Sequence, residues 1–252
     1  MNNIEFVKRL QNIVDNYKTT YMWGVFGSVV DESIISQKSK QYPSWYTSNR
    51  QAYLRKLIGK GYFAFDCVNV IKAILWGWNG DKSKTYGGAK YASNGVPDIG
   101  ADTMITKCSS ISTDFSKVEI GEVVWLKGHI GVYIGNGKVI ECTPSFDNGV
   151  QITACGNIGI ISGLNTRKWT SHGKLPYISY VKEDVVIKNE EDNMFKVGNL
   201  TIVNEKEYQK SAITKAVEQG IITGDGVKLD ASEVINKGDF CVLMEKMGFL
   251  SK

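Results

Sequence analysis

A histidine and a glutamate, His129 and Glu141, lie twelve positions apart on either side of an Asn136-Gly137 pair. Apolar residues run up to this pair and resume after it, which predicts a β-hairpin over residues 128–141. A hairpin can bring a residue at the start of one strand close to a residue late in the other. An imidazole beside a carboxylate is a general base with its orienting group. The hairpin therefore predicts part of a catalytic site, and the nucleophile must come from elsewhere.

Cys67 is the candidate nucleophile. Asp66 is a plausible N-cap for a helix that ends at Gly77 and buries Val68, Ile71, Ile74 and Leu75. In the first turn of that helix, backbone N–H groups and the helix dipole would lower the pKa of the thiol toward neutrality. The alternative is that Cys67 is a small buried apolar residue, the commonest role of a cysteine. The His129–Glu141 pair favours the nucleophile.

The elements expected around these residues are helical in the front half and extended in the second half. Apolar spacing predicts an opening helix, and a polar, irregular passage follows Gly24. Further helices are expected at 51–57 and 101–106, and strands at 122–126, 150–153 and 175–181. Helices followed by a run of antiparallel strands indicate an α+β fold.

Composition and charge limit the classes of function. The 252 residues suit one large domain or two smaller ones. Residues 1–182 hold 21 Lys/Arg against 13 Asp/Glu, and residues 183–252 hold 9 against 13. A positive front half suits an anionic polymer, and a solvated surface without a partner is the alternative. The basic residues are scattered and form no basic helix or aromatic–basic motif, which disfavours a nucleic-acid binder.

The five cysteines are an odd number and lack the paired spacing of metal ligands. We therefore expect no disulfide framework, no zinc site, no cofactor and at least one free thiol. The start of the chain has no basic segment followed by an apolar run, so we expect synthesis in the cytoplasm without a signal peptide. No apolar stretch approaches the roughly 20 residues that span a bilayer, so membrane insertion is not expected.

The last quarter of the chain has a different composition. Residues 183–194 are charged and lack an apolar face, which indicates a linker. Residues 195–252 predict a small helical module, with helices at 208–219 and 232–248. A module of this size would be marginally stable alone, so we expect it to dock on the front domain or to self-associate.

With these residues in place, the chain resembles the NlpC-type family, papain-like cysteine peptidases that cut the stem peptides of bacterial peptidoglycan. The resemblance covers about residues 1–180. It rests on the hairpin run Gly-His-Ile-Gly-Val-Tyr-Ile-Gly-Asn-Gly, on Cys67 after Asp66, and on a polar residue twelve positions after His129. The family's Tyr-x-Trp-Gly-Gly motif is matched in part by Tyr21-Met22-Trp23-Gly24.

The resemblance implies a papain-like catalytic domain, a helical front half packed on an antiparallel sheet, at residues 1–182. In it Cys67 is the nucleophile, His129 the base and Glu141 the residue that orients the imidazole. Tyr21 and Asp66 would lie at the substrate. A thiolate–imidazolium pair would attack a peptide carbonyl and form an acyl-enzyme that water resolves.

The chain departs from the family pattern at three places. Glu141 stands where the family more often has histidine or a side-chain amide, and Val68-Asn69 replaces Ser-Gly. The interval from Trp23 to Cys67 is longer than usual, so Trp45 and its neighbours are expected to form an inserted wall or lid over the substrate groove.

The tail resembles, more loosely, wall-binding modules of the S-layer-homology type at residues 216–224 and 239–244. A catalytic front and a wall-binding tail resemble a phage endolysin, which a holin would release to act on peptidoglycan and its anionic polymers. Three alternatives stay open: an N-acetylmuramoyl-L-alanine amidase with the same triad, a transferase, and a non-catalytic wall-binding protein.

Other residues have structural interpretations. His172 is expected in a loop outside the site, and Cys142 is expected to point away from Glu141 into the core. Cys108, Cys155 and Cys241 are interpreted as core residues. Trp76 and Trp78 are interpreted as packing residues rather than a sugar platform.

Overall fold

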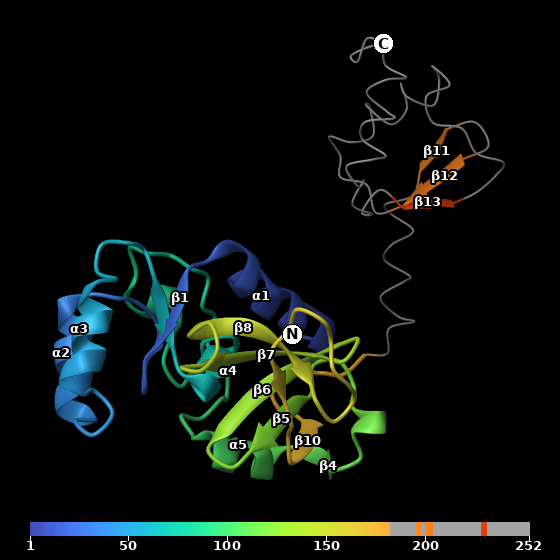
Figure 1. The fold of residues 1–252 in the computed structure, drawn as a ribbon. Helices are drawn as coiled ribbons and strands as arrows, with labels where there is room; N and C mark the ends of the chain where they lie inside the picture. The colour runs from blue at the N-terminus through green and yellow to red at the C-terminus, as the bar shows by residue number, and fades with distance from the viewer. Residues whose placement is uncertain (182–194, 198–199, 204–227, 231–252) are drawn as a thin grey trace. The chain divides into compact units, whose positions relative to one another are not determined.

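A computed structural model of the chain describes residues 1–181, 195–197, 200–203 and 228–230. These residues fall into two compact units, Met1–Tyr180 and Val181–Lys252 (Figure 1). The first unit ends close to residue 182, where the sequence predicts the end of the front domain.

The first unit is a mixed α+β structure, as the sequence predicts. Its α-helices are α1 (Asn3–Asn16), α2 (Glu32–Gln41), α3 (Ser48–Arg55), α4 (Cys67–Leu75) and α5 (Ala101–Lys107). Two short 3-10 turns, η1 (Thr85–Gly88) and η2 (Phe115–Lys117), lie in the connections. Its strands are β1 (Thr19–Tyr21), β2 (Phe26–Val29), β3 (Phe63–Phe65), β4 (Ser109–Ser112), β5 (Val123–Leu126), β6 (His129–Gly135), β7 (Lys138–Thr143), β8 (Gly149–Cys155), β9 (Thr166–Arg167) and β10 (Ser171–Lys174).

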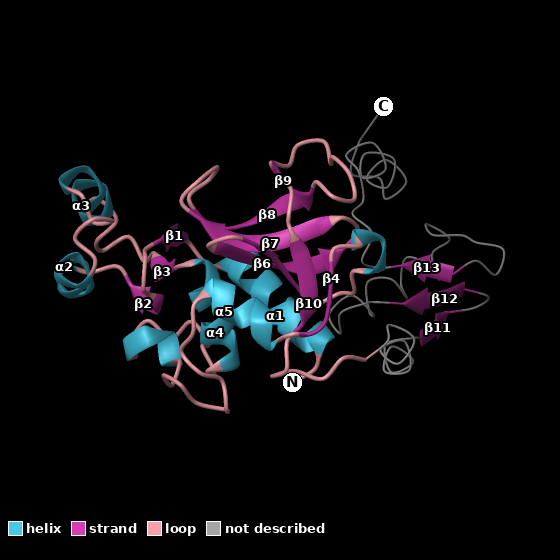
Figure 2. Cartoon of the chain, turned by 90° about the horizontal axis from the view of Figure 1, so that it is seen from below, coloured by secondary structure: helices cyan, strands magenta, loops and turns pink. Residues whose placement is uncertain are grey.

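The strands form a small sheet and a large sheet. The small sheet has the order β1-β3-β2, and the large one has the order β4-β10-β5-β6-β7-β8-β9. Every pairing in the large sheet is antiparallel except β8–β9. Helices α1, α4 and α5 lie on one face of the large sheet (Figure 2). The hairpin strands β6 and β7 are therefore central, and one of their faces is covered by helix.

Helix α4 is the central helix of this core. Every one of its residues is buried, and it packs against β6 and β7. The Asp66 side chain accepts a hydrogen bond from the backbone N–H of Asn69 at 2.7 Å, so it caps the helix as predicted. After Trp76, Gly77 has a φ of +88° and ends the helix in the left-handed region that favours glycine. Cys67 thus begins a rigid, buried element.

The prediction of an irregular passage after Gly24 is wrong. Strand β2 and helix α2 occupy this region, and β3 follows α3. Asp31 caps α2 by accepting a hydrogen bond from Ile34 N at 2.8 Å. The sequence carried a signal for α2: a capping residue before an apolar pair, Ile34-Ile35. The other side chains of this helix are mainly polar. A helix with so narrow an apolar face gives a weak periodic pattern.

The predicted strand at 175–181 is also wrong. The last strand of the large sheet is β10, which ends at Lys174 and pairs with β4 and β5. Pro176 has no backbone N–H with which to continue a ladder. The chain turns instead, and the N–H of Leu175 donates to the Tyr180 hydroxyl at 2.9 Å.

In the second unit the structure describes three strands, β11 (Phe195–Val197), β12 (Leu200–Val203) and β13 (Lys228–Asp230). Strand β12 pairs antiparallel with β11 and parallel with β13. The sequence predicts a small helical module here and does not predict these strands. The predicted linker and the helices at 208–219 and 232–248 lie outside the described residues.

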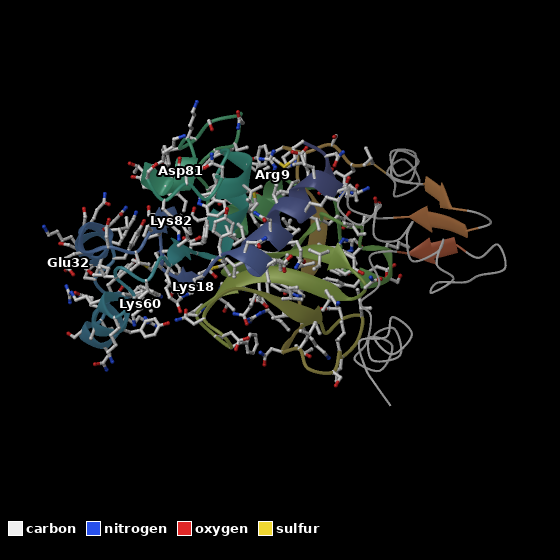
Figure 3. The ribbon with its side chains drawn as sticks, turned by 90° about the horizontal axis from the view of Figure 1, so that it is seen from above. Arg9, Lys18, Glu32, Lys60, Asp81 and Lys82 are labelled. Carbon is white, nitrogen blue, oxygen red and sulfur yellow. The ribbon has the colours of Figure 1, made fainter. Side chains whose placement is uncertain are left out.

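Charged side chains of both signs lie on separate surface elements of the first unit (Figure 3). Arg9 on α1 pairs with Glu5, and Glu32 on α2 pairs with Arg55. Exposed pairs of this kind contribute little to stability. None of the described helices is long and apolar enough to cross a membrane.

Candidate active site

The β6–β7 hairpin brings the predicted base and its orienting group together. Asn136 and Gly137 have φ values of 50° and 69°, the left-handed pair of a tight hairpin turn. The register sets Gly131 opposite Glu141, and His129 lies two residues before Gly131 on the same side of the strand. His129 Nε2 lies 2.6 Å from Glu141 Oε2. The predicted imidazole–carboxylate pair is therefore present in the structure.

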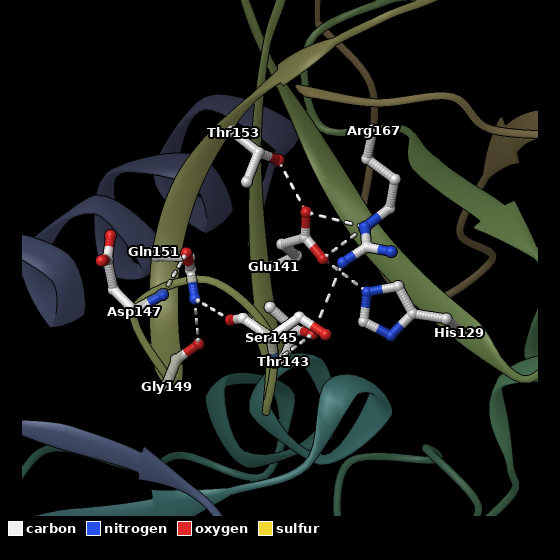
Figure 4. A network of polar contacts seen from close by, with 9 residues as sticks. All are labelled: His129, Glu141, Thr143, Ser145, Asp147, Gly149, Gln151, Thr153 and Arg167. Carbon is white, nitrogen blue, oxygen red and sulfur yellow. Dashed lines mark hydrogen bonds and ion pairs between the residues drawn. The ribbon is translucent and has the colours of Figure 1, made fainter. Parts of the chain in front are cut away.

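Glu141 is the centre of a larger polar network than the sequence indicated (Figure 4). The Arg167 Nε–H donates to both carboxylate oxygens, at 3.0 and 2.8 Å. The Thr153 hydroxyl donates to Oε1 at 2.7 Å. The Glu141 side chain is fully buried, so its charge depends on these donors. Arg167 is the part of the site that the sequence analysis missed, because it lies 26 residues beyond Glu141 and no local pattern links them.

An aromatic wall fixes the plane of the imidazole. The ring of Trp169 stacks on His129 with centroids 5.5 Å apart and an interplanar angle of 12°. A Cβ atom at Gly131 would lie 3.1 Å from the Trp169 ring and 2.7 Å from Val139, so a side chain there would crowd this wall. Hydrogen bonding at Nε2 and stacking on the ring together hold His129 in one orientation. Its other nitrogen, Nδ1, makes no hydrogen bond within the described part of the chain.

The electrostatics of Glu141 are set by opposing effects. Burial alone would raise its pKa, but the hydrogen bonds and charges of His129 and Arg167 outweigh burial and lower the pKa below the ordinary 4.5. A carboxyl group with a lowered pKa stabilises the fold above the pKa of the unfolded chain. That contribution is lost as the pH falls through the folded pKa.

We therefore expect the Glu141→Gln substitution to cost most stability above about pH 5 and progressively less toward about pH 3. Urea unfolding of both proteins across this range measures the difference. A difference that stays constant over the range would contradict a lowered pKa. Activity should fall less than in Cys67→Ala or His129→Ala, because an amide oxygen can still accept a hydrogen bond from the ring.

Cys67 lies beside the start of the hairpin. The backbone N–H groups of Ile130, Val68 and Cys67 itself lie near enough to the sulfur to lower the pKa of the thiol. Ile130 is the residue next to His129, so helix α4 brings the thiol to the end of β6 that carries the base. The Tyr21 hydroxyl is also near the thiol, and Cys67 contributes to the raised pKa of Tyr21. The structure thus places the predicted nucleophile beside the residue that follows the predicted base.

The expected low pKa of Cys67 is not observed. Burial and the neighbouring charge of Asp66 raise the pKa of the thiol to about 12, and the three backbone N–H groups only partly oppose this. Cys67 is 6% exposed, so loss of solvation outweighs the helix dipole. Burial likewise raises the pKa of Tyr21, which keeps its hydroxyl as a neutral donor. The resting thiol is protonated and must transfer its proton as it attacks.

Asp66, a predicted substrate-binding residue, is held by protein donors. Oδ1 accepts from Asn69 N at 2.7 Å, while Oδ2 accepts from Asn69 Nδ2 at 2.7 Å and from Gly24 N at 2.9 Å. Asn69, which departs from the family pattern, thus helps to fix Asp66. These bonds tie the Trp23-Gly24 turn to the start of α4. Asp66 also lines a cleft beside Cys67.

We expect Asp66→Ala to lower the free energy of unfolding by about 2–3 kcal/mol, since it removes a helix cap and leaves buried N–H donors unpaired. Thermal or urea unfolding measures this loss. The matched control is Asp31→Ala, which removes the cap of the more exposed helix α2 and should cost about 1 kcal/mol. Equal losses in the two variants would contradict the structural role of Asp66.

A cleft of about 800 Å³ opens beside Cys67. Tyr21, Asp66 and Cys67 line it, as do Gly128 and residues of α2 and of the 98–103 segment. Trp45, the third predicted substrate-binding residue, does not line this cleft. Its ring packs against Tyr21, with centroids 5.7 Å apart, and against the guanidinium of Arg50. One wall of the cleft is therefore built by α2 and Tyr42, and Trp45 packs against Tyr21 without lining the cleft.

The structure also places the residues that have structural interpretations. His172 is not in a loop: it lies on β10, buried, with Nδ1 hydrogen-bonded to Glu122 and Nε2 3.1 Å from Asp114 O. The loop prediction is therefore wrong. Glu122 is the carboxylate partner of His172, as Glu141 is of His129. Cys142 packs in the core with its thiol directed to Phe65 O, as predicted.

The remaining predicted core residues behave as expected where the structure describes them. Trp76 and Trp78 are buried, and each donates its indole N–H to a backbone carbonyl. Cys67, Cys108, Cys142 and Cys155 are free thiols, and Cys241 lies outside the described residues. No cluster of metal-ligating side chains occurs among the residues that the structure describes.

No protein-family model matches this chain, and no curated protein matches its sequence.

Proposed function

We propose that the first unit is a papain-like cysteine peptidase that hydrolyses an amide bond in the stem peptides of bacterial peptidoglycan. The observation that supports this most is the arrangement at the start of β6. A cysteine at a helix start lies against the N–H of Ile130, next to a histidine whose Nε2 is bonded to the buried Glu141. Nucleophile, base and orienting group are the parts that acyl transfer requires. The substrate class follows from the resemblance of the hairpin and cysteine motifs to NlpC-type peptidases.

The proposed mechanism begins with a protonated thiol. As a peptide carbonyl enters the cleft, Nδ1 of His129 takes the thiol proton and the sulfur attacks the carbonyl carbon. Glu141 holds the ring and balances its positive charge, and Arg167 holds the Glu141 carboxylate in place. The backbone N–H groups at the start of α4 and the Tyr21 hydroxyl would donate to the oxyanion.

The second half of the reaction restores the enzyme. The imidazolium gives its proton to the leaving amine, and the C–N bond breaks to leave a thioester on Cys67. His129 then takes a proton from water, and the resulting hydroxide attacks the thioester carbonyl. The C–S bond breaks, the sulfur regains a proton from His129, and a free carboxylic acid leaves the cleft.

The rest of the proposal concerns the whole chain. Residues 195–252 would bind the cell wall and its anionic polymers, and the protein would reach the wall as an endolysin does, through holin-type release from the cytoplasm. This part rests on the resemblance of the tail motifs and on the positive charge of residues 1–182.

Digestion of purified sacculi tests the activity. Mass spectrometry of the released fragments should find a new amino group and a new carboxyl group on stem-peptide residues. A new amino group on the first stem residue, with the lactyl carboxyl freed, would identify the amidase instead. New reducing sugar ends would contradict both, and sacculus binding without any cleavage would identify a wall-binding protein.

A further inference from the structure

Helix α2 contributes a lysine to the cleft. Gln37, Lys38 and Gln41 line it, together with Tyr42 at the end of the helix. This helix belongs to the segment between Trp23 and Cys67 that is longer than in the resembled family. The side chains of α2 can therefore give the cleft a selectivity of its own.

Lys38 is buried, with 9% of its surface exposed. Its ammonium donates to the Gln41 side-chain oxygen at 3.0 Å and lies 5.7 Å from the centre of the Tyr42 ring. Within the described part of the chain it forms no ion pair with a carboxylate. An ammonium has three hydrogens to donate, and burial without an anionic partner costs free energy.

The other lysine of the cleft shows the contrast. Lys72 on α4 is buried, and its ammonium pairs with Asp98 and donates to Ile99 O at 3.0 Å. Its charge is already balanced inside the protein. Lys38 has only the amide of Gln41 and the face of Tyr42.

Two carboxylates affect Lys38 through space, and both are already bound. Asp66 accepts hydrogen bonds from Asn69 and Gly24, and Asp98 accepts from Lys72 and from the Tyr91 hydroxyl at 2.8 Å. Burial lowers the pKa of Lys38, and the charges of these two carboxylates partly oppose that effect. Lys38 is therefore the cation of this cleft whose hydrogens remain for an incoming anion.

We propose that Lys38 binds a free carboxylate of the peptide substrate, so that the cleft selects stem peptides that carry this carboxylate over those in which it is amidated. The inference rests on the proposed peptidase function and adds a substrate class to it. A buried ammonium–carboxylate contact forms a charge-assisted hydrogen bond, which a carboxamide replaces poorly.

The test uses soluble stem-peptide fragments in which each free carboxylate is replaced, in turn, by a carboxamide. For one such pair we expect the wild-type kcat/KM to be at least about tenfold higher for the carboxylate peptide than for the carboxamide peptide. The difference should come mainly from a lower KM for the carboxylate peptide. Lys38→Met should reduce the preference to about equal rates, while Lys38→Arg should keep most of it. The matched control is Lys40→Met, which removes the same charge from an exposed position on the same helix.

Binding of the same peptides to the Cys67→Ala protein, measured by calorimetry, separates the two proposals. A preference for the carboxylate peptide in binding, without turnover by the wild type, would overturn the peptidase function and retain the site at Lys38. Equal binding of every pair, or a preference that survives Lys38→Met, would overturn the role of Lys38. Equal rates for every peptide pair with the wild-type protein would overturn the proposal without any Lys38 variant, so it stays falsifiable even if Lys38→Met does not fold.

Discussion

Replacing His129 with alanine should lower kcat/KM by about 10²- to 10⁴-fold, the contribution of a positioned general base. The effect should be this large because burial raises the pKa of Cys67 to about 12, so the thiol depends on an acceptor for its proton. The fold should persist, since Glu141 keeps Arg167 and Thr153 as partners when the ring is removed. Initial rates on a stem peptide, with circular dichroism of the variant, measure both.

The other histidine provides the matched control. His172 is also bonded to a glutamate, Glu122, but the contacts of its ring lie within residues 114–122, none of which acts on Cys67 as Ile130, the neighbour of His129, does. Its pair is buried, so His172→Ala should lower the free energy of unfolding by about 2–4 kcal/mol. At a temperature where the variant is folded, it should keep most of the wild-type kcat. A larger rate loss in His172→Ala than in His129→Ala would contradict the assignment of the base.

Replacing Arg167 with methionine should have the second large effect. Its Nε–H contacts both oxygens of Glu141, whose side chain is fully buried, while the Arg167 side chain is 20% exposed. Removing one partner of such a pair leaves a buried charge that is only partly compensated. We expect the free energy of unfolding to fall by about 2–3 kcal/mol, somewhat below the value for a fully buried pair.

The same substitution should also reduce activity. Without Arg167, Glu141 keeps His129 and Thr153 as partners, and its carboxylate is free to rotate away from the ring. A loss of one charged hydrogen bond predicts a fall in kcat on the order of tenfold, with KM little changed. Arg167→Lys keeps the charge but loses the planar donor. Compared with Arg167→Met, it should therefore restore more of the free energy of unfolding than of kcat. Unchanged kcat and stability in Arg167→Met would contradict the network.

The parts of the site that the sequence predicts are those fixed by local rules. An Asn-Gly turn sets the register of β6 and β7, and that register places His129 and Glu141 together. A capping aspartate sets the start of α4, and thus the position of Cys67. In each case a few neighbouring residues decide the backbone geometry, so the pattern can be read without the rest of the chain.

The parts that sequence reasoning missed depend on residues far apart in the chain. Arg167 reaches Glu141 only because β9 pairs with β8, and the expected low pKa of Cys67 fails because of burial by the whole core. Helix α2 gives a weak periodic signal because most of its residues are polar, yet it forms the cleft wall. Long-range packing, rather than local propensity, sets all three.

The most direct measurement is the rate at which new amino groups appear from purified sacculi with two cysteine variants. Cys67→Ala removes the proposed nucleophile, and Cys142→Ala removes a buried thiol on the core side of β7. We predict that Cys142→Ala, compared at a temperature where it is folded, keeps most of the wild-type rate and that Cys67→Ala falls to the rate without enzyme. A folded Cys67→Ala protein that keeps a substantial part of the wild-type rate would contradict the assignment of Cys67 as the nucleophile.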